Sequence, residues 1–175
     1  STYKFLNIFL GEMTALFPDA YFHIGGDECN GKEWNANPEI QSFMHAHNLA
    51  NNAALQAYFT AKVQKLVAKN HKIMEGWDEV LQPETPKNVV IQSWRGGASL
   101  AEAARQGNRG ILSTPYYLNL DHPTSYYYLA DPLGGVAAAL TPEQKARILG
   151  GEAAMWSVFV TAENINKQIW PYLAA

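Results

Sequence analysis

The chain has 175 residues with 47% hydrophobic and 17% charged side chains, which is enough for one globular domain with a core. Its net charge of −3 and the absence of a basic run argue against nucleic acid or an anionic membrane surface as a partner. A single cysteine, Cys29, excludes an internal disulfide; no apolar run is long enough to cross a bilayer, and no secretory signal opens the chain. The cellular compartment stays open.

A helix is predicted over residues 1–17, where apolar side chains recur at helical spacing from Phe5 to Leu16. Pro18 ends this helix, because proline cannot continue one. The short apolar run from Ala20 to Ile24 is predicted to be a buried strand that follows the helix.

Asn37-Pro38-Glu39 predicts the start of a second helix, with asparagine as its cap and proline in its first turn. Residues 51–69 predict a third helix, because apolar residues line one of its faces. Residues 72–77 form the second predicted strand. Residues 89–94 form the third, which begins with β-branched residues.

The second half of the chain continues the alternation. Residues 98–106 predict a short helix that ends at Gly107, and residues 109–113 predict a fourth strand. Residues 118–140 show no periodicity, and a loop of that length is expected to be functional or disordered.

Thr141-Pro142-Glu143-Gln144 is a capping-box pattern that predicts the start of another helix. Residues 151–156 predict a fifth strand, and a weaker helix from Thr161 is expected to be interrupted at Pro171. Strands that alternate with helices favour right-handed βα units and a parallel sheet. The sequence therefore predicts one α/β domain over residues 1–175.

The first strand ends in Gly25-Gly26-Asp27-Glu28. Adjacent side chains of an extended segment point to opposite faces, and a glycine pair can turn the backbone so that both acids reach one pocket. The C-terminal ends of parallel strands are where α/β folds carry their chemistry. The alternative reading is that Asp27 only caps the next helix.

The other predicted strands end in aromatic residues: Trp77, Trp94, Tyr116-Tyr117 and Trp156. Three indoles at three strand ends favour a shared pocket over a purely structural role. Indoles stack on the apolar faces of a pyranose, and a carboxylic acid can protonate a glycosidic oxygen. Burial beside tryptophan would raise the pKa of such an acid. The pattern therefore favours a carbohydrate as the ligand.

Five motifs stand out along the chain: His23-Ile24-Gly25-Gly26-Asp27-Glu28, Gly76-Trp77-Asp78-Glu79, Ser93-Trp94, Tyr116-Tyr117-Leu118 and Gly150-Gly151-Glu152-Ala153-Ala154-Met155-Trp156. In sequence and in order they resemble the motifs of glycoside hydrolase family 20, the β-N-acetylhexosaminidases. The resemblance spans most of the chain. It implies part of a (β/α)8 TIM barrel, from the fourth strand to the eighth, with about five parallel βα units.

The resemblance also implies substrate-assisted catalysis, in which the sugar's 2-acetamido oxygen attacks the anomeric carbon with net retention. Glu28 would be the general acid and base, Asp27 would hold the acetamido N–H, and Tyr117 would donate to the acetamido oxygen. The implied walls of the pocket are Trp77, Trp94 and Trp156. His23 is grouped with the substrate-binding residues, although a structural role for it stays open.

Two positions depart from the family pattern. Asn119 stands where the family usually has an aspartate that binds a sugar hydroxyl, with Asp121 two residues further on. Val158 stands where a glutamate usually binds another hydroxyl. Recognition of the sugar hydroxyls is therefore weakened, and we expect both GlcNAc and GalNAc as terminal sugars.

A complete barrel needs roughly 250 residues, and an open five-stranded sheet would expose its edges. Self-association as a homodimer that covers the open side is therefore expected. The alternatives are a weakly active or inactive barrel fragment and a lectin-like module that binds N-acetylhexosamine.

Other titratable residues are interpreted as structural. Glu75, Asp78 and Glu79 are expected to be solvated loop charges. His45 and His47 face different ways on a helix, and no ligand spacing suggests a metal. No cofactor is expected.

Overall fold

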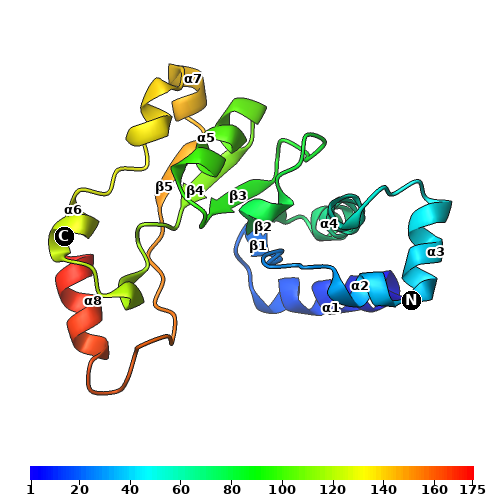
Figure 1. Cartoon of the computed structure of the whole chain (residues 1–175), viewed down its shortest axis with the longest axis horizontal. Helices are drawn as coiled ribbons and strands as arrows, with labels where there is room; N and C mark the ends of the chain where they lie inside the picture. The colour runs from blue at the N-terminus through cyan, green and yellow to red at the C-terminus, as the bar shows by residue number, and fades with distance from the viewer. The chain divides into compact units, whose positions relative to one another are not determined.

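The computed structural model describes residues 1–175, which divide into two compact units, residues 1–89 and residues 90–175. Unit 1 runs from blue to green in Figure 1 and unit 2 from green to red. In unit 1, β1 (Tyr21–His23) pairs in parallel with β2 (Ile73–Trp77). In unit 2, β3 (Val90–Ser93), β4 (Arg109–Leu112) and β5 (Ile148–Gly151) pair in parallel in that order. The prediction of an α/β fold with five parallel strands is confirmed.

Three helices of unit 1 lie where the sequence predicts them: α1 (Thr2–Leu16), α3 (Pro38–Ala46) and α4 (Asn52–Lys69). Unit 1 also contains the short helix α2 (Lys32–Ala36) and the 3-10 turn η1 (Asp78–Val80). The predicted cap of α3 is confirmed, because Asn37 Oδ1 accepts hydrogen bonds from the N–H of Glu39 at 2.9 Å and of Ile40 at 3.3 Å. Asn51 caps α4 in the same way. Helix α2 has no counterpart among the predictions.

The core of unit 1 forms where α1 and β2 pack against α4. Leu10, Val63, Val67 and Met74 are buried there. The strand β1 differs from the prediction, because its burial is incomplete: Tyr21 is 39% exposed and His23 is also exposed. The reason is that β1 is an edge strand, so within unit 1 its side chains have neighbours on one side.

The helical elements of unit 2 are α5 (Gly97–Gln106), η2 (Leu118–Leu120), α6 (Thr124–Tyr128), η3 (Gly135–Ala139), α7 (Pro142–Lys145) and α8 (Ile165–Leu173). Helix α5 packs on β3 and β4 and buries Leu100, Ala101 and Ala104. Gly107 ends α5 in the left-handed conformation, with φ 94°, as predicted.

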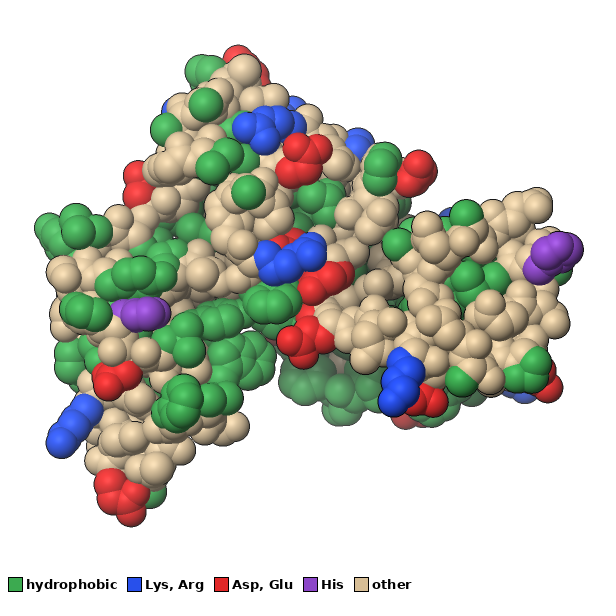
Figure 2. All heavy atoms as spheres, in the orientation of Figure 1, with side chains coloured by type: hydrophobic (Ala, Val, Ile, Leu, Met, Phe, Trp, Pro, Cys, Tyr) green, Lys and Arg blue, Asp and Glu red, His purple; other side chains and the backbone are tan.

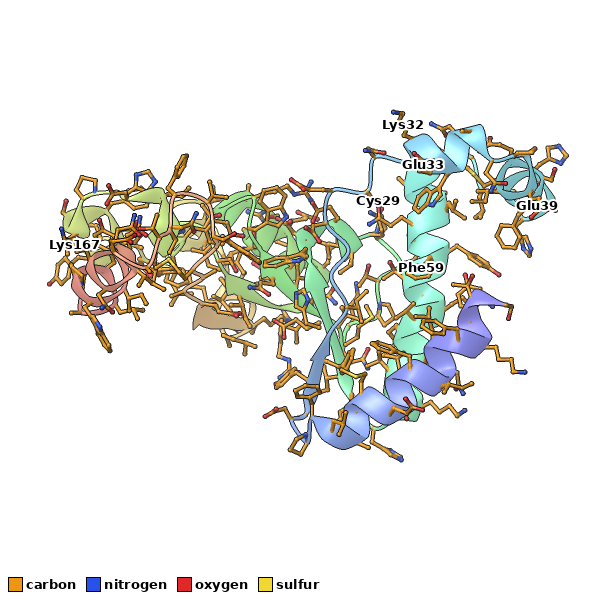
Figure 3. All side chains as sticks on the ribbon, turned by 90° about the horizontal axis from the view of Figure 1, so that it is seen from below. Cys29, Lys32, Glu33, Glu39, Phe59 and Lys167 are labelled. Carbon is orange, nitrogen blue, oxygen red and sulfur yellow. The ribbon has the colours of Figure 1, made fainter.

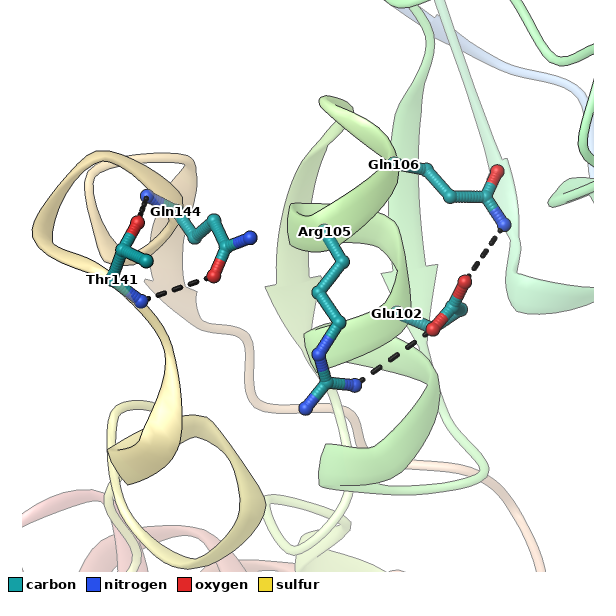
Figure 4. A network of polar contacts seen from close by, with 5 residues as sticks. All are labelled: Glu102, Arg105, Gln106, Thr141 and Gln144. Atoms are coloured by element: carbon teal, nitrogen blue, oxygen red, sulfur yellow. Dashed lines mark hydrogen bonds and ion pairs between the residues drawn. The ribbon is translucent and has the colours of Figure 1, made fainter.

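The surface of α5 and the start of α7 carry local polar contacts (Figure 4). Oε1 of Glu102 accepts a hydrogen bond from Nε2 of Gln106 at 3.1 Å, and Oε2 of Glu102 lies 3.7 Å from Nη1 of Arg105. Thr141 and Gln144 form the reciprocal capping box that the sequence predicted. The exposed ion pair between Glu102 and Arg105 adds little stability, whereas the capping box satisfies two backbone N–H groups at the start of α7.

Three predictions for unit 2 are wrong in detail. The segment 118–140 contains η2, α6 and η3 rather than a structureless loop, since Tyr127 and Ala137 provide buried anchors. The fifth strand covers Ile148–Gly151 rather than residues 151–156, because the short strand β4 pairs with those residues and the ladder ends there. Helix α8 begins at Ile165 and contains Pro171 in its last turn rather than being interrupted by it.

None of the helices combines the length and the apolar character needed to span a membrane.

Candidate functional site

The turn after β1 is built by two glycines in backbone conformations that other residues resist. Gly25 has φ 75° and Gly26 has φ 110°. Glu28 is itself left-handed, with φ 51°. The turn places Asp27 and Glu28 just beyond the C-terminal end of β1, where both side chains are exposed. The burial expected for the acid is therefore not found within this chain, because nothing in unit 1 packs over the two carboxylates.

Asp27 does not cap a helix. The cap position of the next helix, α2, is Gly31, and no side chain caps it. The alternative reading of Asp27 as a helix cap is therefore wrong.

Three neighbours hold the glycine turn in unit 1. Gln56 of α4 donates from Nε2 to the carbonyl oxygen of Gly26 at 2.6 Å. His23 accepts at Nδ1 from the N–H of Gly25 at 3.0 Å. A Cβ on Gly26 would lie 2.6 Å from Cγ1 of Val80, so this glycine is required by space as well as by its φ angle. The turn is thus shaped by backbone conformation and close packing.

Trp77 ends β2 beside the same turn. The backbone N–H of Trp77 donates to the carbonyl oxygen of Gly25 at 3.0 Å. The Trp77 and His23 rings meet edge-on, with their centroids 5.0 Å apart and an interplanar angle of 70°. The structure therefore brings four sequence-predicted residues of unit 1 into one neighbourhood: His23, Asp27, Glu28 and Trp77.

Asp78 differs from its interpretation as a solvated charge. It is 2% exposed, whereas Glu75 and Glu79 are partly exposed. The reason is that η1 turns back directly after β2 and carries Val80 into the core, which takes Asp78 inside with it.

In unit 2, Trp94 follows β3 and is half-buried. Its carbonyl oxygen accepts a hydrogen bond from Oγ1 of Thr114, which lies two residues before Tyr116 in the chain. The buried Ser93 hydroxyl donates to Gly96 at 2.7 Å and fixes the turn that carries Trp94.

Tyr117 and Trp156 are brought together beyond the end of β4 and β5. The backbone N–H of Leu118 donates to the carbonyl oxygen of Ala154 at 2.9 Å, and the backbone N–H of Ala154 donates to the carbonyl oxygen of Tyr116 at 3.1 Å. These bonds continue the parallel pairing past the strands. The Tyr117 and Trp156 rings meet edge-on at 6.1 Å and 79°. Trp156 thus lies in an irregular segment and not at a strand end.

Asn119 and Asp121 are both engaged within unit 2. Asn119 is 2% exposed, and its Oδ1 accepts from the N–H of Trp156 at 3.3 Å. Asp121 is exposed and left-handed, with φ 54°, and its Oδ1 accepts from the Tyr172 hydroxyl at 2.6 Å. This hydrogen bond to a carboxylate is the main cause that raises the pKa of Tyr172 to about 12.

The residues that support the site were not predicted from the sequence. Gln56 and Val80 hold the glycine turn, and Tyr127 and Tyr172 contact the segment that carries Tyr117. Gly76 inside a predicted strand was a usable signal for close packing, since a Cβ there would lie 2.9 Å from Cγ1 of Val80. Tyr172 bonds to Asp121, which is 51 residues away along the chain, so no local pattern reveals this contact.

Carboxylates after one parallel strand and aromatic side chains after others are typical of an α/β protein that carries its chemistry at the C-terminal ends of its strands. The comparisons with known proteins give the family. The sequence model that describes the catalytic domain of glycosyl hydrolase family 20 matches residues 1–175. The chain belongs to this family.

Curated relatives match the whole chain. The β-hexosaminidase subunit alpha of Bos taurus is 34% identical over 189 residues, and the β-hexosaminidase subunit beta of Homo sapiens is also 34% identical over 189 residues. These alignments cover 100% of this chain but only 35% and 33% of those proteins. The chain therefore spans about a third of the length of the curated relatives it matches.

Solved structures agree. A chitobiase from Flavobacterium johnsoniae is 44% identical with a TM-score of 0.92 over 99% of this chain and 27% of that one. An exo-β-N-acetylglucosaminidase from Vibrio harveyi, solved in complex with N-acetylglucosamine, is 30% identical with a TM-score of 0.82 over 98% of this chain and 29% of that one. The chain is thus part of a family 20 catalytic barrel.

Proposed function

We propose that the chain acts as an exo-β-N-acetylhexosaminidase, which hydrolyses terminal β-linked GlcNAc or GalNAc with retention through an oxazoline intermediate. The observation that carries this proposal is the Asp27-Glu28 pair, presented after β1 by the Gly25-Gly26 turn in a chain that matches family 20 throughout. The bound N-acetylglucosamine of the Vibrio harveyi enzyme supports the same class of substrate.

Glu28 is the proposed general acid. Its carboxylic acid gives its proton to the glycosidic oxygen while the acetamido oxygen of the substrate bonds to the anomeric carbon and the leaving group departs. Glu28, now a carboxylate, then takes a proton from the water that opens the oxazoline. Its exposed position beyond β1 leaves it free to meet a glycosidic oxygen at the end of a glycan.

Asp27 and Tyr117 are the proposed partners of the acetamido group. The Asp27 carboxylate accepts from the acetamido N–H and stabilises the positive charge that develops in the oxazolinium-like transition state. The Tyr117 hydroxyl donates to the acetamido oxygen and holds it in attack geometry. Aromatic contact with the sugar and its methyl group is assigned to Trp77, Trp94 and Trp156, with His23 supporting Trp77.

Hydroxyl recognition is proposed to be permissive. The Asn119 side-chain oxygen, at the position where the family usually has an aspartate, is buried and bonded to the Trp156 N–H. Asp121 is bonded to Tyr172 and remains exposed. With Val158 unable to accept or donate a hydrogen bond, both GlcNAc and GalNAc fit the proposal.

A homodimer is proposed for the assembly. Large apolar side chains of α1 are exposed in unit 1. The exposed fraction is 65% for Phe5 and 71% for Leu16, the last residue of the helix. Such a surface favours association with a second copy. Mass measurement in solution tests the dimer, and Leu16→Glu is expected to dissociate it. A compact monomer at micromolar concentration in the unaltered protein would contradict it.

The test of the activity is the release of p-nitrophenol from the β-N-acetylglucosaminide, the β-N-acetylgalactosaminide and the plain β-glucoside. Hydrolysis of both acetamido sugars and not of the glucoside is expected, because only they carry the internal nucleophile. Equal hydrolysis of the glucoside would contradict the mechanism.

A lectin-like module is the alternative, and Glu28→Gln separates the two functions. The enzyme should lose about 10²–10⁴-fold in kcat while GlcNAc binding persists, since a general acid contributes to turnover and not to binding. Glu39→Gln is the control, because it removes the same charge from an exposed position on α3 (Figure 3). Binding of GlcNAc without turnover in the unaltered chain would support the lectin.

A further inference from the structure

Two tyrosines from different helices of unit 2 meet beside the segment that carries Tyr117. Tyr127 belongs to α6 and is 4% exposed, and Tyr172 belongs to α8. Their rings stack at 4.5 Å with an interplanar angle of 28°. Helices α6 and α8 pack together, and Figure 1 shows them side by side at the C-terminal end of the chain.

The Tyr127 hydroxyl is bonded to both ends of the η2 turn. It donates to the carbonyl oxygen of Tyr117 at 3.3 Å and accepts from the N–H of His122 at 3.3 Å. A single buried hydroxyl therefore closes the short segment that begins with the proposed acetamido ligand. Burial is the main cause that raises the pKa of Tyr127, so this hydroxyl stays protonated and able to donate.

The Tyr172 hydroxyl holds the same segment from the other side. It donates to Oδ1 of Asp121 at 2.6 Å, and Asp121 occupies the left-handed conformation that ends η2. The left-handed backbone conformation costs a non-glycine residue conformational energy, and it persists only where surrounding contacts hold it in place. The bond from α8 supplies such a restraint.

We propose that Tyr127 and Tyr172 form a clamp that positions Tyr117 for its contact with the acetamido oxygen. This inference rests on the proposed function. Neither residue touches the substrate, and both act through the η2 segment. The clamp makes the C-terminal helix α8 part of the catalytic apparatus, because α8 supplies the ring on which Tyr127 stacks and the hydroxyl that holds Asp121.

The kinetic test uses Tyr127→Phe and Tyr172→Phe, which keep the ring stack and remove one hydroxyl each. With p-nitrophenyl β-N-acetylglucosaminide, each change is expected to lower kcat about fivefold to tenfold, with KM changed less than about twofold, because the lost contact serves the transition state. Tyr128→Phe is the control, since Tyr128 lies in the same helix and is 70% exposed.

A double-mutant cycle separates positioning from general loss of stability. In a Tyr117→Phe background, Tyr127→Phe should change kcat by less than about twofold, because the group that it positions is already gone. The same fivefold to tenfold loss in both backgrounds would overturn the clamp.

A readout that needs no turnover keeps the test independent of the proposed activity. The N–H of Leu118, bonded to Ala154 at 2.9 Å, should exchange with solvent about tenfold faster in Tyr127→Phe than in Tyr128→Phe, as measured by NMR. Unchanged exchange would overturn the clamp even in an inactive chain. Absent turnover together with faster exchange would contradict the proposed function and the catalytic purpose of the clamp, and would leave only its hold on the η2 segment.

Discussion

The turn that carries Asp27 and Glu28 and the segment that carries Tyr117 are held in different ways. The first depends mainly on backbone shape: two glycines with positive φ and close contact with Val80, together with one side-chain hydrogen bond each to Gln56 and His23. The second depends on side-chain hydrogen bonds: the hydroxyls of Tyr127 and Tyr172 reach it from other helices of unit 2, and its own Asn119 amide oxygen accepts from the N–H of Trp156.

The difference follows from what each group must do. A general acid has to approach a glycosidic bond at the end of a glycan, and an exposed turn with few side-chain attachments leaves that approach open. A group that holds the acetamido oxygen has to be fixed within a narrow geometry. The buried contacts of Asn119 and Tyr127 supply that rigidity.

The largest expected effect tests the chemistry of the exposed turn. Asp27→Asn keeps the size of the side chain and removes its charge, so kcat on the acetamido sugars should fall about 10²–10³-fold. Steady-state kinetics with p-nitrophenyl β-N-acetylglucosaminide measures this. Asp19→Asn, an exposed change in the same unit, serves as the control. An unchanged kcat in Asp27→Asn would remove Asp27 from the mechanism.

The next effect tests whether backbone shape holds that turn. Gly26→Ala places a Cβ 2.6 Å from Val80 at a φ of 110°, so it should lower the free energy of unfolding by about 1–3 kcal/mol. Gly97→Ala at the start of α5 meets nothing within 4 Å and should be neutral or stabilising by up to about 1 kcal/mol. Urea unfolding of both variants measures the difference, and equal stabilities would contradict the account.

A smaller effect is expected at the second segment. Asn119→Ala leaves the N–H of Trp156 without its side-chain acceptor, which should cost about 1–2 kcal/mol of stability. Asn166→Ala on the exposed face of α8 should change stability by less than about 0.5 kcal/mol. Thermal unfolding compares the two, and a neutral Asn119→Ala would show that this contact does not hold the segment.

The smallest effect is the pH dependence of the tyrosine clamp. The pKa of Tyr172 is raised to about 12 by its bond to Asp121. The folded state therefore holds this proton more tightly than the unfolded state, whose tyrosine has a pKa near about 10. The stabilisation is complete below about pH 10 and is lost as the pH rises through about 12.

The measurement is thermal unfolding at about pH 9 and about pH 11, compared between the unaltered protein and Tyr172→Phe. The unaltered protein should lose more stability over this interval. Equal losses in the two proteins would mean that the bond to Asp121 contributes nothing to folding.

Local signals in the sequence predicted a large part of the fold. The cap at Asn37, the capping box at Thr141 and the glycine end of α5 each act through neighbouring residues, so they can be recognised without the structure. The Gly25-Gly26 turn is of the same kind.

The errors concern features that distant pairing decides. The fifth strand was placed too late, because the position of Ile148–Gly151 depends on pairing with β4 and not on its own pattern. The burial of Asp78 depends on how η1 folds onto the core.

The candidate site divides in the same way. The residues at strand ends could be found from the sequence, since a strand and its end are local. The roles of Gln56 and Tyr172 could not, because each reaches a segment far away along the chain.

The most direct test of the central claim, that the acetamido group of the substrate is the nucleophile, is a rate series on p-nitrophenyl glucosaminides whose acetyl group carries none, one, two or three fluorine atoms. Fluorine withdraws electrons from the acetamido oxygen, so kcat should fall steeply with each added atom. Equal rates across the series, or turnover of the plain β-glucoside at a similar rate, would contradict substrate-assisted catalysis by this chain.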